Sequence, residues 1–113
     1  MLEHMTIFEK TYQLILWLYP QVQKFPKSQR FVLGQQVEQC SLDILRGVIR
    51  ANASRAKLPI LIEISTDLDT LRILLRLCKD MKFISIRQYA FAQEQVNEVG
   101  KLLGGWIRAQ GRS

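Results

Sequence analysis

Hydrophobic residues recur along most of this chain at spacings of three and four, which is the period of an amphipathic α-helix. Four such blocks follow one another, over residues 6–24, 28–53, 58–82 and 85–109. The third block has the most regular apolar stripe. Its members are Leu61, Ile64, Leu68, Leu71, Leu75 and Cys78. Because only short polar breaks separate the blocks, the pattern predicts an all-α fold, an antiparallel up-down-up-down four-helix bundle.

Local signals place the ends of these helices. Ser28 follows the turn Phe25-Pro26-Lys27 and is a candidate N-cap of the second helix, and Ser85 is a candidate N-cap of the fourth. Pro59 stands where a first helical turn tolerates proline. Pro20 lies inside the first block, and we expect a kink there because proline removes one backbone donor.

The remaining stripes define the expected core. In the first block they are Ile7, Thr11, Leu14, Leu18 and Phe25; in the second, Phe31, Leu33, Val37, Cys40, Ile44 and Val48; in the fourth, Tyr89, Ala92, Val96, Val99, Leu103 and Trp106. Cys40 and Cys78 fall on apolar faces of separate helices, which is typical of buried thiols in a reducing compartment. A disulfide between them is the alternative.

Three glycines interrupt the last helix, at Gly100, Gly104 and Gly105. Each glycine inside a helix costs about 1 kcal/mol relative to alanine, so a gain elsewhere must offset them. Gly100 and Gly104 are four apart and share a face, which leaves room for another backbone or a bulky ring to approach closely. The contact is either within the bundle or between subunits.

Two blocks carry more apolar surface than one bundle core requires. Residues 14–19 are apolar around more than a full turn, and Ile73, Leu74 and Leu77 lie outside the stripe of the third helix. A helix that is apolar all round is buried all round, so we expect a homo-oligomer. The expected interface residues are Leu16, Trp17, Tyr19, Gly100 and Gly104. The alternative is a broad core with Trp17 and Tyr19 half exposed.

Length and composition describe a single basic globular domain. The chain has 113 residues, a net charge of +6 and 48% hydrophobic residues. Met1-Leu2-Glu3-His4 precedes a second methionine and has the character of a vector-derived leader, so we place the domain at residues 5–113. No basic segment with an apolar core follows, and the longest apolar run, 14–19, is too short to span a bilayer. We therefore expect a cytoplasmic protein with no membrane partner.

Residues for catalysis and metal binding are scarce. The only histidine is His4, in the expected leader, which removes Ser-His and Cys-His arrangements and most zinc sites. Two scattered cysteines do not hold a metal by themselves. The glycines at 100–105 have no following Lys-Ser or Lys-Thr, so they do not form a phosphate loop. We expect no catalytic residues, no metal, no cofactor and no enzymatic activity.

The basic residues form two groups in such a bundle. The loop after the second helix lies beside both chain ends. One group therefore gathers there, namely Arg50, Arg55, Lys57, Arg108, Arg112 and Lys10. The second is a stripe on the third helix that we expect to be exposed, Arg72, Arg76 and Lys79, near Lys82, Arg87, Lys24, Lys27 and Arg30. Arginine supplies nine of the sixteen cations and suits bidentate phosphate contact, which favours a polyanion partner over an ordinary solvated face.

Three segments resemble a known family. They are Leu16-Trp17-Leu18-Tyr19-Pro20 with Phe25-Pro26-Lys27, then Leu33-Gly34-Gln35-Gln36-Val37, and finally Glu98-Val99-Gly100-Lys101-Leu102-Leu103-Gly104-Gly105-Trp106-Ile107-Arg108. Together they resemble the accessory variability determinant of diversity-generating retroelements, over nearly all of residues 6–108. The last segment is the most specific. The Phe-Pro-Lys turn is shared with the wider four-helix proteins encoded in intervening sequences of 23S ribosomal RNA genes.

The resemblance implies a basic four-helix protomer that assembles into a barrel-shaped homopentamer, encoded by a bacterium or phage. It also implies binding to the retroelement's reverse transcriptase and to RNA or DNA, in support of the adenine-directed mutagenic copying of template RNA into cDNA. In that family, basic surface residues carry the partner contacts. The positions here that match this role are Arg72, Arg76 and Lys79, followed by Arg46 and Arg50.

Two other classes stay open. An intervening-sequence-type bundle would act only as a structural or protein-interaction module. A helix-turn-helix DNA reader fits less well, because the long uninterrupted stripes leave no short recognition helix. A neighbouring reverse-transcriptase gene with a pair of template and variable repeats would separate the first class from the retroelement protein.

Overall fold

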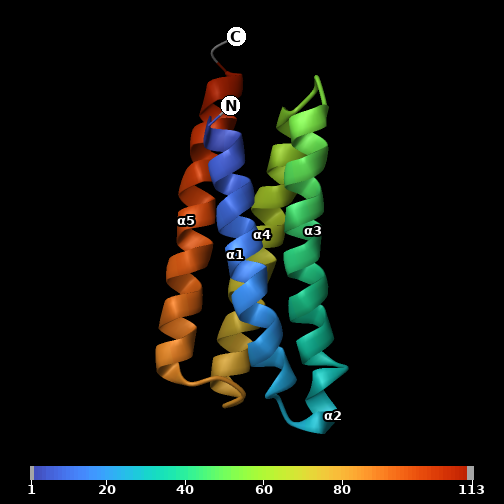
Figure 1. The fold of residues 1–113 in the computed structure, drawn as a ribbon, viewed down its shortest axis with the longest axis vertical. Helices are drawn as coiled ribbons and strands as arrows, with labels where there is room; N and C mark the ends of the chain where they lie inside the picture. The colour runs from blue at the N-terminus through green and yellow to red at the C-terminus, as the bar shows by residue number, and fades with distance from the viewer. Residues whose placement is uncertain (1, 112–113) are drawn as a thin grey trace.

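The computed structural model describes the backbone of residues 2–111 and the side chains of residues 7–111. This part of the chain contains five helices: α1 (Leu2–Gln23), α2 (Lys27–Arg30), α3 (Leu33–Ala53), α4 (Leu58–Asp80) and α5 (Ile86–Gln110). Four are long and stand side by side, and α2 is a single turn at one corner (Figure 1). The expectations for His4 and Arg112 lie outside the described side chains.

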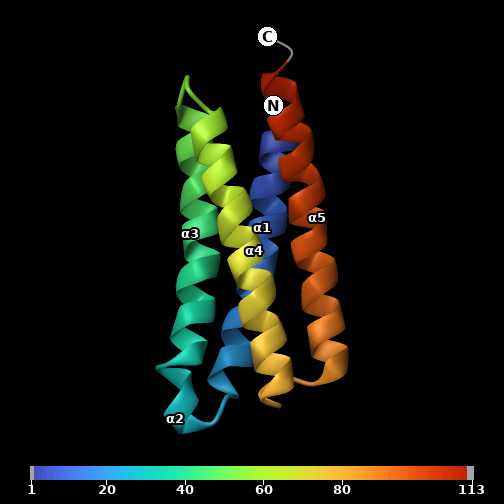
Figure 2. The same ribbon diagram turned by 180° about the vertical axis from the view of Figure 1, so that it is seen from behind.

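The four long helices form a closed ring of antiparallel neighbours. In this ring α3 packs between α1 and α4, and α5 packs between α4 and α1. The beginning of α1, the loop between α3 and α4, and the end of α5 lie at the same end of the bundle (Figure 1 and Figure 2). This arrangement confirms the up-down-up-down four-helix bundle. Within residues 2–111, no helix combines the length and apolar character that a membrane span requires.

The core follows the apolar stripes closely. All six stripe residues of α4 are buried, and so are the stripe residues of α5 from Ala92 to Trp106. In α1, the hydroxyl of the buried Thr11 donates to the carbonyl of Ile7 at 2.8 Å, which leaves no unpaired polar group there. Burying each large apolar side chain stabilises the fold by about 1.5–3 kcal/mol. Because helical spacing identifies most of these side chains, it accounts for most of the architecture.

The second predicted helix is broken near its start, which corrects the single block at 28–53. α2 ends at Arg30 and α3 begins at Leu33. The side chain of Val22 lies 2.7 Å from where a Cβ of Gly34 would stand, so the first turn of α3 presses closely on the end of α1. Because the chain turns to make this contact, Phe31 leaves the apolar stripe and is 71% exposed.

The predicted helix ends are partly right. Ser28 is not an N-cap, because it lies inside α2, and the cap position, Pro26, has no side-chain hydrogen bond. Ser85 does cap α5: its hydroxyl accepts from the amide of Gln88 at 3.0 Å, and the Gln88 side chain accepts from the amide of Ser85 at 2.8 Å. Pro59 stands in the first turn of α4, and α1 continues through Pro20 to Gln23.

Both cysteines are free and buried, so the disulfide alternative is wrong. The Cys40 thiol donates to the backbone carbonyl of Asp67 at 3.2 Å, which joins α3 to α4. Burial raises the pKa of Cys40 and of Cys78 to about 11. Both thiols are therefore protonated at neutral pH and are poor nucleophiles.

Candidate functional site

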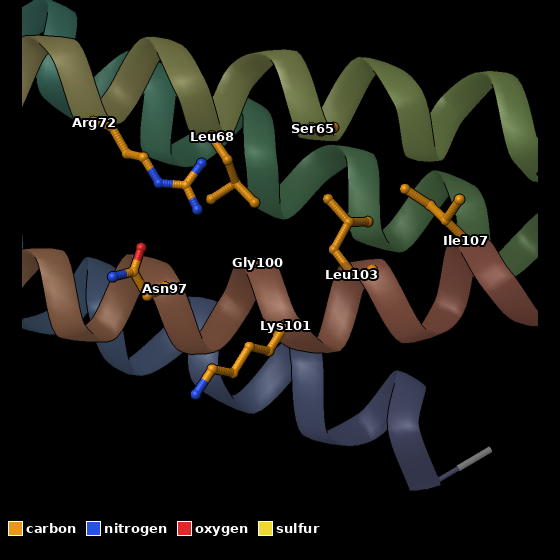
Figure 3. A pocket seen from close by; sticks show the side chains of 9 residues that line it. Ser65, Leu68, Arg72, Asn97, Gly100, Lys101, Leu103 and Ile107 are labelled. Atoms are coloured by element: carbon orange, nitrogen blue, oxygen red, sulfur yellow. The ribbon is translucent and has the colours of Figure 1, made fainter.

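A hollow of about 410 Å³ lies between α4 and α5. It is lined by Ser65, Leu68, Arg72, Asn97, Gly100, Lys101, Leu103, Gly104 and Ile107. Leu68 and Leu103 extend toward each other across the gap between the two helices, and Arg72 reaches from α4 toward Asn97 and Gly100 (Figure 3). None of these nine described residues carries a carboxylate. The hollow therefore combines apolar walls with positively charged and neutral polar groups.

The Arg72 guanidinium lies directly over Gly100. Its Nη2 stands 2.8 Å from the position that a Cβ of residue 100 would take. Its Nη1 pairs with Oδ1 of Asp69 at 2.8 Å, and the side chain is 32% exposed. The side-chain amide of Gln93 on α5 also donates to the Arg72 backbone carbonyl, at 3.4 Å. Arg72 is thus held on both helices, and the bare backbone of Gly100 makes room for it.

A second guanidinium covers the other glycines. Nη1 of Arg108 lies 3.4 Å from the Cβ position of Gly104, and Nη2 lies 3.8 Å from that of Gly105. Beyond helix α5 itself, no backbone or ring of the described chain comes within 4 Å of the Cβ positions of Gly100 and Gly104. The approach of a backbone or ring within the bundle is therefore not found among the described residues, and the group that comes close to Gly100 is the Arg72 side chain of α4. Contact with another subunit at this face stays a prediction.

The three cations of α4 differ in exposure, which corrects the expectation that all are exposed. Arg76 is 66% exposed and its Nε lies 3.9 Å from Asp80. The Lys79 ammonium lies 4.8 Å from the centre of the Tyr89 ring and 3.3 Å from Asp80. Arg72 and Lys79 occupy the flank of α4 that faces α5, so their stems are partly covered. We call Arg72, Arg76 and Lys79 the basic flank.

The other predicted cations lie away from this flank. Arg46 pairs with Asp43 at 3.4 Å, and Arg50 lies 3.7 Å from Glu63 on α4. Arg55 is exposed in the loop between α3 and α4.

Lys57 is an exception among the predicted binding residues because its ammonium serves the fold. It donates to the backbone carbonyls of Ser54 at 2.7 Å, Ala51 at 2.8 Å and Asn52 at 3.2 Å. These carbonyls belong to the end of α3 and the loop that follows, where no helical partner is available. Lys57 therefore caps α3, and its role as a binding residue is less favoured.

The expected interface residues do not behave alike. Leu16 is 54% exposed, whereas Trp17 packs on Phe91 of α5 with ring centres 5.0 Å apart. Tyr19 is half-buried, and burial, followed by the nearby Glu38 charge, raises the pKa of its hydroxyl. Much of the apolar surface of α1 is therefore covered within the protomer.

Four large apolar side chains of α4 remain exposed, in two pairs. They are Leu58 with Ile62, and Ile73 with Leu77. Their spacing places them on the side of the helix opposite the buried stripe. The sequence pattern drew attention to Ile73 and Leu77 and missed Leu58 and Ile62, although the spacing of four between these two was the available signal.

The residues that hold Arg72 were also missed. Asp69 stands three positions before Arg72, a spacing that brings side chains together on a helix, so this partner was visible in the sequence. Gln93 and Asn97 belong to another helix, and no local signal could have found them. Among the described residues, no three histidine, cysteine or acidic side chains are placed to hold a metal ion.

Comparisons with known proteins agree with this architecture. The sequence profile of the bAvd-like family matches residues 5–110. The fold is similar to the crystal structure of a protein of unknown function from the S23 ribosomal protein family of Bacteroides thetaiotaomicron, with a TM-score of 0.86 and 16% sequence identity. That alignment covers 94% of this chain and 98% of the other. At this identity the likeness concerns the fold alone. No curated protein sequence matches the chain.

Proposed function

Because this chain belongs to the bAvd-like family, we propose that it is a non-catalytic accessory protein of a diversity-generating retroelement. In this role it binds the retroelement's reverse transcriptase and nucleic acid, template RNA or cDNA, in the cytoplasm of a bacterium. The family match over residues 5–110 is the observation that carries the proposal. It needs no cofactor.

The basic flank is the binding surface that the geometry favours. Arg72, Arg76 and Lys79 stand four and three residues apart, so their charges follow one another along α4, and Arg72 lines the hollow between α4 and α5. The ion pair of Arg72 and the ring contact of Lys79 restrict these long side chains before any partner binds. Less conformational entropy is then lost on binding. The net charge of +6 adds a long-range attraction for polyanions.

A homopentamer is part of the same proposal. The exposed apolar side chains Leu58, Ile62, Ile73 and Leu77 lie on one side of α4, and exposed Leu16 adds to the apolar surface of α1. Large exposed apolar patches mark interaction sites in soluble proteins, and a second subunit would cover them. Assembly would also repeat the basic flank around a ring, which strengthens the electrostatic field.

The test compares two triple variants that remove the same charge. In the first, Arg72, Arg76 and Lys79 are replaced by alanine; in the second, Arg46, Arg50 and Arg55 are replaced. We expect the first variant to lose co-purification with the cognate reverse transcriptase and cDNA synthesis on template RNA, at unchanged oligomeric mass. Its affinity for RNA should also depend less steeply on salt, because fewer phosphates are engaged. Full activity of the first variant and loss in the second would move the binding surface to α3 and its loop.

The second candidate is a structural or protein-interaction module. The likeness to a bundle of the S23 ribosomal protein family favours it at the level of the fold. A module of this kind predicts that neither triple variant changes cDNA synthesis. It also predicts that no reverse-transcriptase gene with template and variable repeats lies beside the gene for this chain.

A further inference from the structure

Gly100 is the point where the Arg72 side chain crosses onto α5. The guanidinium Nη2 is 2.8 Å from the Cβ position of residue 100, which is closer than real Cβ atoms approach other heavy atoms. Among the described residues, no other atom beyond α5 itself lies within 4 Å of that position. Any side chain larger than hydrogen at residue 100 would therefore displace the guanidinium.

No packing in the core compensates for the cost of placing Gly100 inside a helix. Glycine disfavours the helical state, and close packing of backbone or ring is the usual compensation. Within the part of the chain that the structure describes, the group that uses the space is a charged side chain that is 32% exposed. What the glycine preserves is therefore the position of the Arg72 guanidinium.

That position is fixed from two further directions. Asp69 pairs with Nη1 at 2.8 Å, and the Gln93 amide anchors the Arg72 backbone from α5. In Figure 3 the Asn97 side chain also points toward the guanidinium. Guanidinium carries five N–H donors, and the Asp69 contact does not use them all. The remaining donors are available to a ligand in the hollow that Arg72 lines.

We propose that the hollow between α4 and α5 is an anion-binding site for a phosphate of a nucleic-acid backbone, and that Gly100 is its positioning residue. The proposal rests on the proposed function of the basic flank and assigns one ligand group to it. Gly100 lets Arg72 lie across α5 over the bare helix, so that its guanidinium meets the phosphate inside the hollow instead of in bulk water.

A phosphate is favoured over a partner's carboxylate because the cations form a line. Lys79, Arg76 and Arg72 follow one another along α4, each within 4 Å of Asp69 or Asp80, and Arg108 lies over the next glycines of α5. Arg72 and Lys101 line the hollow itself. A row of cations along a helix suits a chain with regularly repeated negative charges. Arginine also matches the geometry of phosphate oxygens through paired donors.

The experiment compares four variants in binding a labelled oligouridylate at several salt concentrations, and in thermal unfolding. They are Gly100→Ala, Arg72→Ala, the double variant, and the control Gly105→Ala. The control makes the same change in the same helix, where the nearest atom beyond the helix backbone is an Arg108 nitrogen at 3.8 Å.

We expect Gly100→Ala to raise the melting temperature and to weaken RNA binding severalfold, with the salt slope reduced by about one phosphate. Gly105→Ala should raise the melting temperature and leave RNA binding unchanged. Because Gly100 acts through Arg72, the double variant should bind no more weakly than Arg72→Ala alone.

Results that differ from these would contradict different parts of the proposal. If Arg72→Ala weakens binding and Gly100→Ala does not, the role of Gly100 is wrong and the proposed function stands. If Arg72→Ala changes neither RNA binding nor co-purification of reverse transcriptase, the basic flank itself is wrong. Loss of reverse transcriptase alone would assign the hollow to a protein carboxylate. A change in oligomeric mass with Gly100→Ala would assign Gly100 to a subunit contact.

Discussion

Two glycines face α4 from opposite sides, and at each of them a Cβ would lie too close to a side chain of α4. The two side chains differ in kind. A Cβ at Gly47 on α3 would lie 2.6 Å from Cγ1 of Ile64, and a Cβ at Gly100 on α5 would lie 2.8 Å from Nη2 of Arg72. Ile64 is fully buried in the core, whereas Arg72 is partly exposed at the edge of a hollow. One glycine lets two helices close on each other, and the other makes space for a charge.

Other contacts also distinguish the two sides of α4. The side that faces α3 is packed into the core, and the side that faces α5 borders a hollow. On the α3 side, the Cys40 thiol bonds to the carbonyl of Asp67 and burial raises the pKa of the Asp67 carboxyl. On the α5 side, Arg72 of the basic flank borders a hollow whose described lining residues include no carboxylate. One side of α4 therefore serves the stability of the core, and the other side carries the surface that we propose for binding.

The largest expected effect on stability is on the side of α4 that packs against α3. Gly47→Ala places a methyl group against a buried branched side chain, and overpacking of this kind costs about 1–3 kcal/mol. Helix propensity returns about 1 kcal/mol, so we expect the free energy of unfolding to fall by up to about 2 kcal/mol in denaturant titration. An increase, as expected for Gly105→Ala, would show that Ile64 moves freely and that the two sides do not differ.

A smaller effect on stability, of opposite sign, is expected for Gly104→Leu on the side of α4 that faces α5. Within the protomer, only the end of the Arg108 side chain lies near this position beyond the helix backbone of the described chain, so helix propensity alone predicts a gain in stability of about 0.8 kcal/mol at unchanged oligomeric mass. Light scattering and thermal unfolding measure both quantities. A lower mass together with a lower melting temperature would place a subunit contact here and would explain the glycines by assembly.

The smallest effects come from two carboxylates with opposite pKa shifts. Burial, followed by the charges of Asp43 and Glu63, raises the pKa of Asp67 above its ordinary 3.8. The hydrogen bond and charge of Lys10 lower the pKa of Glu98 below its ordinary 4.5. Ionised Asp67 therefore opposes folding, whereas the contribution of ionised Glu98 is present above its unfolded pKa and is lost as the pH falls.

We accordingly expect Asp67→Asn to raise the melting temperature slightly at pH 7 and Glu98→Gln to lower it slightly. Both differences should shrink at pH 3, where the carboxyl groups become protonated. The comparison of melting temperatures at the two pH values checks both signs in one series. A Glu98→Gln variant as stable as the parent at pH 7 would show that the ion pair with Lys10 contributes nothing.

Most of the fold was predictable because it follows from local periodicity. The stripe from Leu61 to Cys78 marks the buried face of α4, and Ser85 and Pro59 mark helix starts by backbone chemistry that neighbouring residues complete. The break between α2 and α3 was not predictable in this way. It depends on how Gly34 fits against Val22 of another helix, and helical spacing carries no information about that contact.

The same distinction, between features of one helix and contacts between helices, applies to the candidate site. By itself, the sequence determined the helices, their buried faces, the row Arg72, Arg76 and Lys79, and the unusual glycines at 100–105, because these features depend on spacing within one helix. Only the tertiary structure decided that Arg72 lies over Gly100 and that Lys57 caps α3. These contacts join groups from separate segments, and the geometry of helix packing and side-chain reach fixes them after the core has formed.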